Sequence, residues 1–193
     1  MKKNVGANIA LVAVFAALIA AFSLMPPLFA VAGVPFAIQL VIVLLAPLVL
    51  GPRQGALAAL LYVVAGVAGL PVFAGQRSGV AVLLGATGGY LIGYVLGAVA
   101  VGLVASLALR ARRRGAVEFA GLTLAAVLGV VVVHACGVVG LMLAGNKGAG
   151  MALGDAVIAT STFLPLDFVK AILAAVIAGT ILRAFPRLRA LRW

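Results

Sequence analysis

Apolar runs of roughly 20 residues or more, the length a helix needs to cross a hydrocarbon core of about 30 Å, recur along the whole chain. Only short polar interruptions separate them. Of the 193 residues, 66% are hydrophobic and 9% are charged, and the mean hydropathy is +1.36. A soluble domain of this size needs a more polar surface. The sequence therefore predicts one all-α membrane domain, residues 1–193, embedded in the lipid bilayer.

Six transmembrane helices account for these runs when prolines, glycines and basic tips are taken as boundaries. Gly51-Pro52-Arg53 predicts a tight turn, and Pro165 suits the first turn of a helix. Residues 149–163 are expected to form an outer, partly helical segment. The predicted helices are residues 8–29, 36–50, 54–70, 80–109, 119–143 and 165–184.

Basic residues are divided unevenly between the two sides of this six-helix arrangement. Eleven of the 14 Lys and Arg fall on the side of the termini, whereas Arg77 and Lys147 fall on the other side and Lys170 falls inside the last helix. Cytoplasmic loops are enriched in Lys and Arg. We therefore expect both termini in the cytoplasm, in a multi-pass protein of a bacterial or archaeal cytoplasmic (inner) membrane. The basic residues lie in short loops between predicted helices and do not form one surface that could contact nucleic acid. The net charge of +11 therefore does not indicate a nucleic-acid partner.

Catalytic and metal-binding equipment is sparse. The chain has one His, one Cys and three acids, Glu118, Asp155 and Asp167, and none of them has metal-ligand or triad spacing. No GxxxxGK[ST] phosphate-binding motif is present. We expect neither an enzyme nor a metal or cofactor site. His134 is interpreted as a hydrogen-bonded interior residue, with a proton relay as the alternative.

Asp167 and Lys170 are an acid and a base placed together inside a predicted membrane helix. Burying such groups in a bilayer is costly, so they normally face protein or a cavity and mark function. Their i, i+3 spacing puts them on one helix face near its outer end. The alternative is that they only neutralise each other and hold the helix in register.

Further polar and aromatic residues are predicted to converge on this outer end, as a small-molecule pocket requires. The paired glycines among them permit close approach to the backbone, of either a ligand or a neighbouring helix. The predicted substrate-binding residues are Asp167, Lys170, Tyr90, Gly89, Thr87, Phe73, Gln39 and Phe36.

The first helix carries Ala13, Ala17 and Ala21 at four-residue spacing. Small residues at this spacing allow helices to approach closely in lipid. This face is a candidate docking site for a partner subunit, and an intramolecular contact is the alternative.

Five segments, in this order and spacing, resemble the BioY family. Two neighbouring positions depart from its pattern, since Ala86 stands where the family favours proline and Leu166 where it often has glycine. The matching segments are Gly51-Pro52-Arg53-Gln54-Gly55-Ala56, Leu61-Tyr62, Gly69-Leu70-Pro71-Val72-Phe73-Ala74-Gly75, Thr87-Gly88-Gly89-Tyr90 and Phe163-Leu164-Pro165-Leu166-Asp167-Phe168-Val169-Lys170.

This resemblance implies a six-helix S-component fold that captures biotin for an energy-coupling factor (ECF) importer. The implied partners are a transmembrane coupling subunit, met by the alanine face, and two ATPase subunits. Under this hypothesis Asp167 accepts the ureido N–H groups of biotin and Lys170 engages its carboxylate, directly or through a polar bridge. The alternatives are a stand-alone proton-coupled transporter and an S component for a different vitamin.

Overall fold

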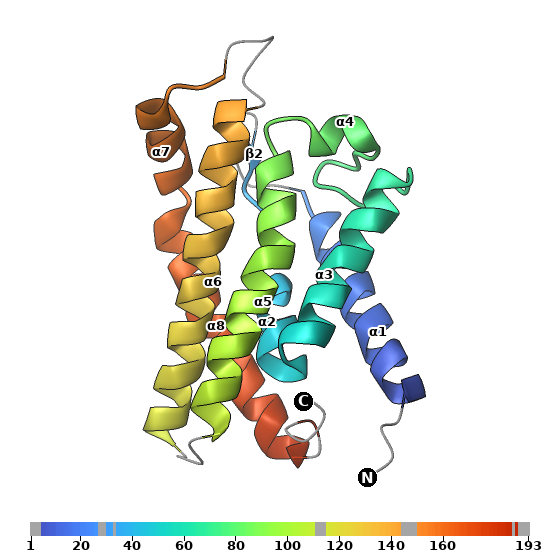
Figure 1. Ribbon diagram of the computed structural model, residues 1–193, viewed down its shortest axis with the longest axis vertical. Coiled ribbons are helices and arrows are strands. Elements are labelled where there is room, and N and C mark those ends of the chain that lie inside the picture. The colour runs from blue at the N-terminus through green and yellow to red at the C-terminus, as the bar shows by residue number, and fades with distance from the viewer. Residues whose placement is uncertain are drawn as a thin grey trace.

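The computed structural model describes residues 5–26, 30–32, 34–110, 115–143, 150–186 and 188. These residues form eight helices and one short hairpin, packed as a single bundle (Figure 1). The predicted helical membrane class is confirmed. Among the described residues, four helices are long and apolar enough to cross a membrane, namely α1 (Val5–Ser23), α5 (Gly88–Arg110), α6 (Ala116–Leu143) and α8 (Leu164–Ala184).

The centre of the bundle is α2 (Leu40–Leu50), whose eleven residues are all buried. The helix is shorter than the predicted 36–50 because the preceding residues form a strand and then a turn. A hairpin of β1 (Ala30–Val31) and β2 (Val34–Pro35) replaces the expected start, so Phe36 lies outside the helix. Pro35 has no N–H to donate to a helical turn. The structure is mostly helical, as predicted, and this hairpin is the one sheet among the described residues.

The turn from α2 into α3 (Pro52–Val67) forms where it was predicted. Gly51 has φ +88°, a left-handed conformation that glycine adopts at little cost, and Pro52 opens the next helix. A Cβ at Gly55 would collide with the backbone of Pro47, and a Cβ at Gly102 of α5 would collide with Pro52. Close backbone contacts of α3 with α2 and of α5 with the start of α3 therefore fix the conformation of this turn.

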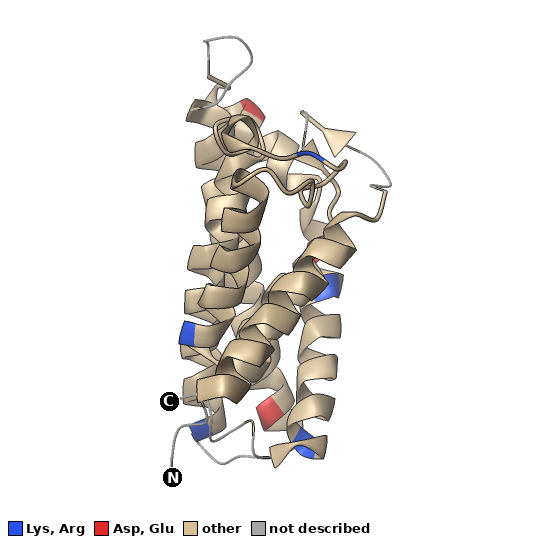
Figure 2. Ribbon diagram, turned by 90° about the vertical axis from the view of Figure 1, so that its right-hand side faces the viewer, with Lys and Arg blue, Asp and Glu red and all other residues tan. Residues whose placement is uncertain are grey.

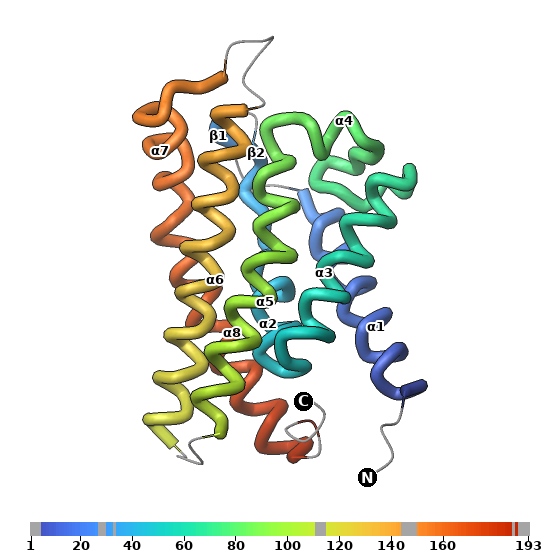
Figure 3. The backbone as a smooth tube through the Cα atoms, in the orientation of Figure 1, coloured from blue at the N-terminus to red at the C-terminus, as the bar shows by residue number. Residues whose placement is uncertain are grey.

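The helix predicted over residues 80–109 is interrupted. A four-residue helix, α4 (Val80–Leu83), comes first, and the chain turns before α5 begins. A Cβ at Gly88 would strike the carbonyl group of Leu83, and Thr87 Oγ1 donates to the carbonyl oxygen of Val82 at 3.5 Å. The break brings Thr87 to the inner surface of the bundle, and Figure 3 shows α4 and the hairpin at the same end of the bundle, opposite the termini.

The contact between α5 and α6 is the most extensive helix–helix contact among the described residues. Cβ atoms at Gly89 and Gly140 would each collide with the facing backbone, so these helices approach at glycine. The predicted spans 119–143 and 165–184 correspond to α6 and α8, and the expected outer segment contains α7 (Leu153–Ser161).

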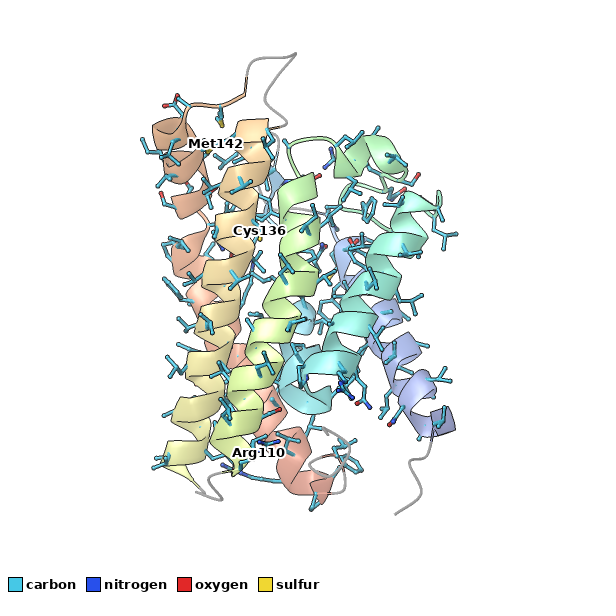
Figure 4. All side chains as sticks on the ribbon, in the orientation of Figure 1. Arg110, Cys136 and Met142 are labelled. Atoms are coloured by element: carbon cyan, nitrogen blue, oxygen red, sulfur yellow. The ribbon has the colours of Figure 1, made fainter. Side chains whose placement is uncertain are left out.

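Charge separates the two ends of the bundle. Arg53 lies in the first turn of α3, Arg110 ends α5 and Arg183 lies in the last turn of α8, at the end where the chain enters and leaves (Figure 2). Figure 4 labels Arg110 at this end and Met142 at the opposite one. Between the ends, many large apolar side chains of α1, α5 and α8 are exposed on the outside, a surface suited to lipid.

Candidate binding site

A cavity lies at the end of the bundle opposite the termini. The space between its lining residues is about 590 Å³, open solvent at its mouth included. Its walls come from α2, α3, α5, α6 and α8, and its cover from α4 and the segments that precede α2, α4 and α5. The lining residues are Val34, Pro35, Phe36, Ala37, Gln39, Leu40, Tyr62, Phe73, Ala74, Arg77, Val82, Thr87, Tyr90, Leu91, Tyr94, Val133, Phe163 and Asp167.

Asp167 is the buried acid of this cavity, with 5% of its surface exposed. It lies in the first turn of α8, where Pro165 starts the helix. Lys170 Nζ donates to Asp167 Oδ1 at 2.6 Å and to the carbonyl oxygen of Ala37 at 2.9 Å. The same ammonium lies 3.6 Å from the centre of the Phe36 ring. The pair predicted from the i, i+3 spacing is confirmed as an ion pair, and it also ties α8 to the segment before α2.

His134 approaches the same carboxylate from α6. Its Nε2 lies 3.2 Å from Asp167 Oδ2, and its Nδ1 lies 2.9 Å from the carbonyl oxygen of Val130. The Tyr90 ring meets the imidazole edge to face, at 6.0 Å between centroids. The expected interior hydrogen bond of His134 is confirmed. Its contact with Asp167 adds a second basic group beside the carboxylate.

An amide and two phenols form the polar part of the α2, α3 and α5 wall. Gln39 Nε2 lies 3.3 Å from both Tyr62 Oη and Tyr94 Oη. Gln39 Oε1 is buried and has no hydrogen-bond partner among the described residues. A buried amide oxygen left in this state is costly. It therefore suits a donor supplied by a ligand in the adjoining cavity.

Aromatic rings make the apolar walls. Phe36 stacks on Phe163 at 6.4 Å between ring centres, and Tyr62 meets Phe73 edge to face at 5.6 Å. Gly66 of α3 leaves the space that the Phe73 ring occupies, since a Cβ there would enter the ring. The cavity therefore combines aromatic walls with a small number of polar groups, as an amphipathic ligand requires.

The one cation among the cavity-lining residues is Arg77, in the loop between α3 and α4. Phe73 and Arg77 exchange backbone hydrogen bonds of 3.0 and 3.2 Å, which fix this loop over the cavity. The Arg77 side chain is exposed, and its Nε donates to the carbonyl oxygen of Ala74 at 3.2 Å. A guanidinium at the edge of a cavity can bind a carboxylate that stays partly in water.

The predicted site residues fall into two groups in the structure. Asp167, Tyr90, Thr87, Phe73, Gln39 and Phe36 line the cavity. Lys170 lies behind Asp167 and Phe36, outside the lining set, and Gly89 lies at the contact of α5 with α6.

Sequence reasoning did not select Tyr62, Tyr94 or Phe163 as site residues, although all three line the cavity. Tyr62 and Phe163 stand in the family-like segments, a signal that was available. Tyr94 lies one helical turn after Tyr90 on α5, and that spacing was the clue.

The alanine face of α1 lies on the outside of the bundle. Ala13, Ala17 and Ala21 are all exposed, whereas Phe15 and Ile19 face α2 and α3. This arrangement excludes an intramolecular role for these alanines in the described part of the chain. The face is available to lipid or to a second protein.

A helical membrane bundle with a half-polar cavity under a loop cover defines a membrane-embedded small-molecule-binding protein. Among the described residues, no group of three or more His, Cys, Asp and Glu is placed to hold a metal ion. The family model for the BioY family matches residues 1–187.

Two relatives named biotin transporter BioY, from Rhizobium etli and Rhodobacter capsulatus, are 34% and 36% identical to this chain. The alignments cover 95% and 93% of this chain and 97% and 95% of the relatives. A crystal structure described as the S-component for biotin from an ECF-type ABC transporter superposes with a TM-score of 0.83 at 24% identity, covering 95% of this chain and 94% of that one. That likeness establishes the fold.

The chain belongs to the BioY family. The family expected from the five sequence segments is thereby confirmed, as is the S-component fold that the resemblance implied.

Proposed function

We propose that this chain captures biotin from outside the cell and delivers it across the membrane as the substrate-binding subunit of an ECF-type importer. The observation that carries the proposal is the cavity, which places a buried carboxylate and an unpartnered amide oxygen beside aromatic walls. Family membership and the names of the relatives support biotin as the ligand.

The chemistry of the cavity favours one orientation of biotin. The ureido ring has two N–H donors, for which Asp167 and Gln39 Oε1 are buried acceptors. The biotin carboxylate is charged, so its burial without a partner would be costly. Arg77 at the exposed edge offers it a cation in contact with water. The ureido ring therefore lies inward, and the valerate chain runs out past Phe73.

This orientation revises one predicted role. Lys170 already donates hydrogen bonds to Asp167 and to the carbonyl oxygen of Ala37, and it does not line the cavity. Its function is to hold Asp167 ionised and to fix the segment before α2, while Arg77 takes the biotin carboxylate. The apolar middle of the ligand packs against Phe36, Phe73 and Tyr90.

The membrane topology that we propose has six spans and cytoplasmic termini. The spans are α1, α2, α3, α5, α6 and α8, with α2 and α3 completed by the irregular segments at the cavity. Irregular backbone is tolerated at membrane depth where it lines a cavity and not lipid. Eleven of the 14 Lys and Arg on the side of the termini favour the cytoplasmic face of a bacterial or archaeal inner membrane.

Energised uptake requires partners, because the sequence has no GxxxxGK[ST] motif with which to bind ATP. The exposed face of Ala13, Ala17 and Ala21 is the proposed contact with the transmembrane coupling subunit. Two ATPase subunits, bound to that coupling subunit, complete the importer.

The test is isothermal calorimetry of biotin binding to the detergent-purified chain, with Arg77→Gln beside the parent. We expect tight binding by the parent that thiamine and riboflavin do not displace. In the proposed orientation Arg77→Gln lowers the affinity for biotin about tenfold. Biotin amide, which lacks the carboxylate, binds the parent and Arg77→Gln equally.

Two results would contradict the proposal. Absence of biotin binding by a folded parent would overturn the ligand. A loss of biotin amide affinity in Arg77→Gln as large as the loss of biotin affinity would overturn the orientation.

A further inference from the structure

His134 is a buried basic group that touches Asp167 and that the proposed capture mechanism does not use. It is 6% exposed and lies on α6, whereas Asp167 and Lys170 lie on α8. The Nε2 atom is 3.2 Å from Asp167 Oδ2 and has no aligned hydrogen bond among the described residues. A buried polar atom whose polar neighbour is a carboxylate oxygen, without an aligned hydrogen bond, requires a physical explanation.

The contact made by Nδ1, the other ring nitrogen of His134, shows that this atom carries a hydrogen. Nδ1 is 2.9 Å from the carbonyl oxygen of Val130, and a carbonyl oxygen can only accept. Nδ1 therefore carries a hydrogen and donates it. A neutral imidazole has a single N–H, so Nε2 of the neutral ring would present a lone pair to Asp167 Oδ2.

A lone pair and an ionised carboxylate oxygen 3.2 Å apart repel each other, and burial strengthens the repulsion. A second proton on the imidazole changes this contact into an attraction between opposite charges. Lys170 already neutralises Asp167 through Oδ1, so the added proton gives the three side chains a net charge of +1.

We propose that His134 is a positioning residue of the biotin site and that its ring is an imidazolium when biotin is bound. Asp167 is then held ionised and oriented between two cations, Lys170 and His134. The inference rests on the proposed function, because it assigns to Asp167 the role of ureido acceptor. An ionised carboxylate accepts two N–H groups, whereas a protonated one has lost part of that capacity. Closing the pocket with biotin removes water from Asp167, which makes the second cation more important.

The sign of the pH dependence follows by linkage. In the proposed mechanism biotin binds the state with His134 protonated, so protonation raises the affinity for biotin. As pH rises and the proton is lost, the affinity for biotin falls, by up to about tenfold per pH unit for one linked proton. Over the range in which His134 loses its proton, binding therefore takes up one proton.

Other titratable groups lie around His134, but the proton linked to biotin binding is assigned to the imidazole. Tyr90 of α5 contacts the ring, and Asp167 and Lys170 of α8 form the network itself. The core helix α2 contains no titratable residue, and Asp155, the only one in α7, is exposed in its first turn. His134→Gln retains all of these groups, so its comparison with the parent isolates the contribution of the imidazole.

The first test uses the fact that the chain has a single histidine. Protein labelled with ¹⁵N in the imidazole ring, purified with a histidine-free tag, gives one pair of ring-nitrogen signals by NMR. We expect both nitrogens to be protonated in the biotin-bound protein at about pH 7. A neutral ring with hydrogen on Nδ1 alone, in protein saturated with biotin, would overturn the proposal.

The second test measures the linked proton. Calorimetry of biotin binding from about pH 5.5 to about pH 9, in buffers of different ionisation enthalpy, gives both the affinity and the protons taken up. We expect uptake of one proton by the parent at the alkaline end and none by His134→Gln, whose affinity no longer changes with pH. The matched control Arg77→Gln also removes one cation from the site, but keeps the pH slope of the parent.

The two tests separate this proposal from the one on which it rests. Biotin binding with no pH slope in the parent, or an equal slope in His134→Gln, overturns the role of His134 and leaves biotin capture intact. Failure of the folded parent to bind biotin at any pH overturns both.

Discussion

In the proposed topology, the outer half of the bundle, which holds the cavity, and the inner half are held together in different ways. The outer half has loops, a hairpin and a broken helix around a cavity, and Gln39, His134, Asp167 and Lys170 are buried there. The inner half, at the end of the termini, is packed by small residues such as Ala98, Ala105 and Ala174. Most of the buried polar side chains therefore gather where a ligand must be recognised, while Ser106 and Glu118 are buried among the small residues of the inner half.

The strongest way to break this division is Asp167→Asn. The substitution keeps the shape of the side chain but leaves Lys170 without its counter-charge and weakens the ureido acceptor. We expect the biotin Kd to rise at least about 100-fold, since the loss of one partner from a buried charge pair costs several kcal/mol. Calorimetry measures it, and Asp155→Asn, at the exposed acid of α7, is the matched control with an unchanged Kd. An Asp167→Asn Kd within about threefold of the parent would contradict the division.

Gly102→Ala examines the inner half. A Cβ there would collide with the Pro52 backbone, so overpacking lowers the free energy of unfolding by about 2 kcal/mol. The thermal midpoint of the purified protein falls, while the biotin Kd of the folded fraction stays within about twofold. Gly154→Ala, where no heavy atom lies within 4 Å of the added Cβ, is the control. Equal midpoints for the two variants would argue against rigid packing in this half.

Ala17→Trp distinguishes both halves from the outer surface of α1. The added indole blocks close approach of a partner helix without touching the cavity, so biotin uptake by cells that also produce the coupling and ATPase subunits falls about tenfold. Calorimetry of the isolated chain gives the parent Kd. Leu18→Trp, at an exposed position beside the alanine face, retains uptake. Normal uptake by Ala17→Trp would remove this face from the docking site.

The smallest expected effect concerns the boundary between α5 and α7. Tyr90 Oη donates to Thr160 Oγ1 at 3.1 Å, both atoms being buried, and Tyr90→Phe removes this hydrogen bond. We expect about 1 kcal/mol less stability and a Kd about threefold higher, because the ring stays on the cavity wall. A double-mutant cycle with Thr160→Val measures the coupling. Additive effects of the two substitutions would show that the bond contributes nothing.

The sequence predicted the charged pair but not its surroundings. Asp167 and Lys170 stood out because an acid and a base inside an apolar helix are costly without a purpose. The approach of His134 depends on how α6 is rotated against α8, which an almost uniformly apolar helix does not encode. The direction in which Tyr62 and Tyr94 face was hidden for the same reason, although a family-like segment marked Tyr62 and the four-residue spacing from Tyr90 marked Tyr94.

Helix existence was easier to predict than helix ends at the cavity. The long spans α6 and α8 agree with expectation, and the turn at Gly51 is where glycine and proline put it. The predicted helix over residues 36–50 starts four residues late, and the one over 80–109 breaks after α4. Hydropathy alone does not distinguish a helical apolar segment from an extended one that lines a pocket.

The complete burial of α2 has a consequence for how the protein enters a membrane. Eleven helical residues extend roughly 16 Å at 1.5 Å per residue, well short of a hydrocarbon core of about 30 Å. A helix of this length has no stable transmembrane position until its neighbours surround it. In the proposed topology α2 therefore does not enter the membrane as a self-sufficient span. It enters together with α3, as a hairpin joined at Gly51, and its burial is complete when α5 and α8 pack around it.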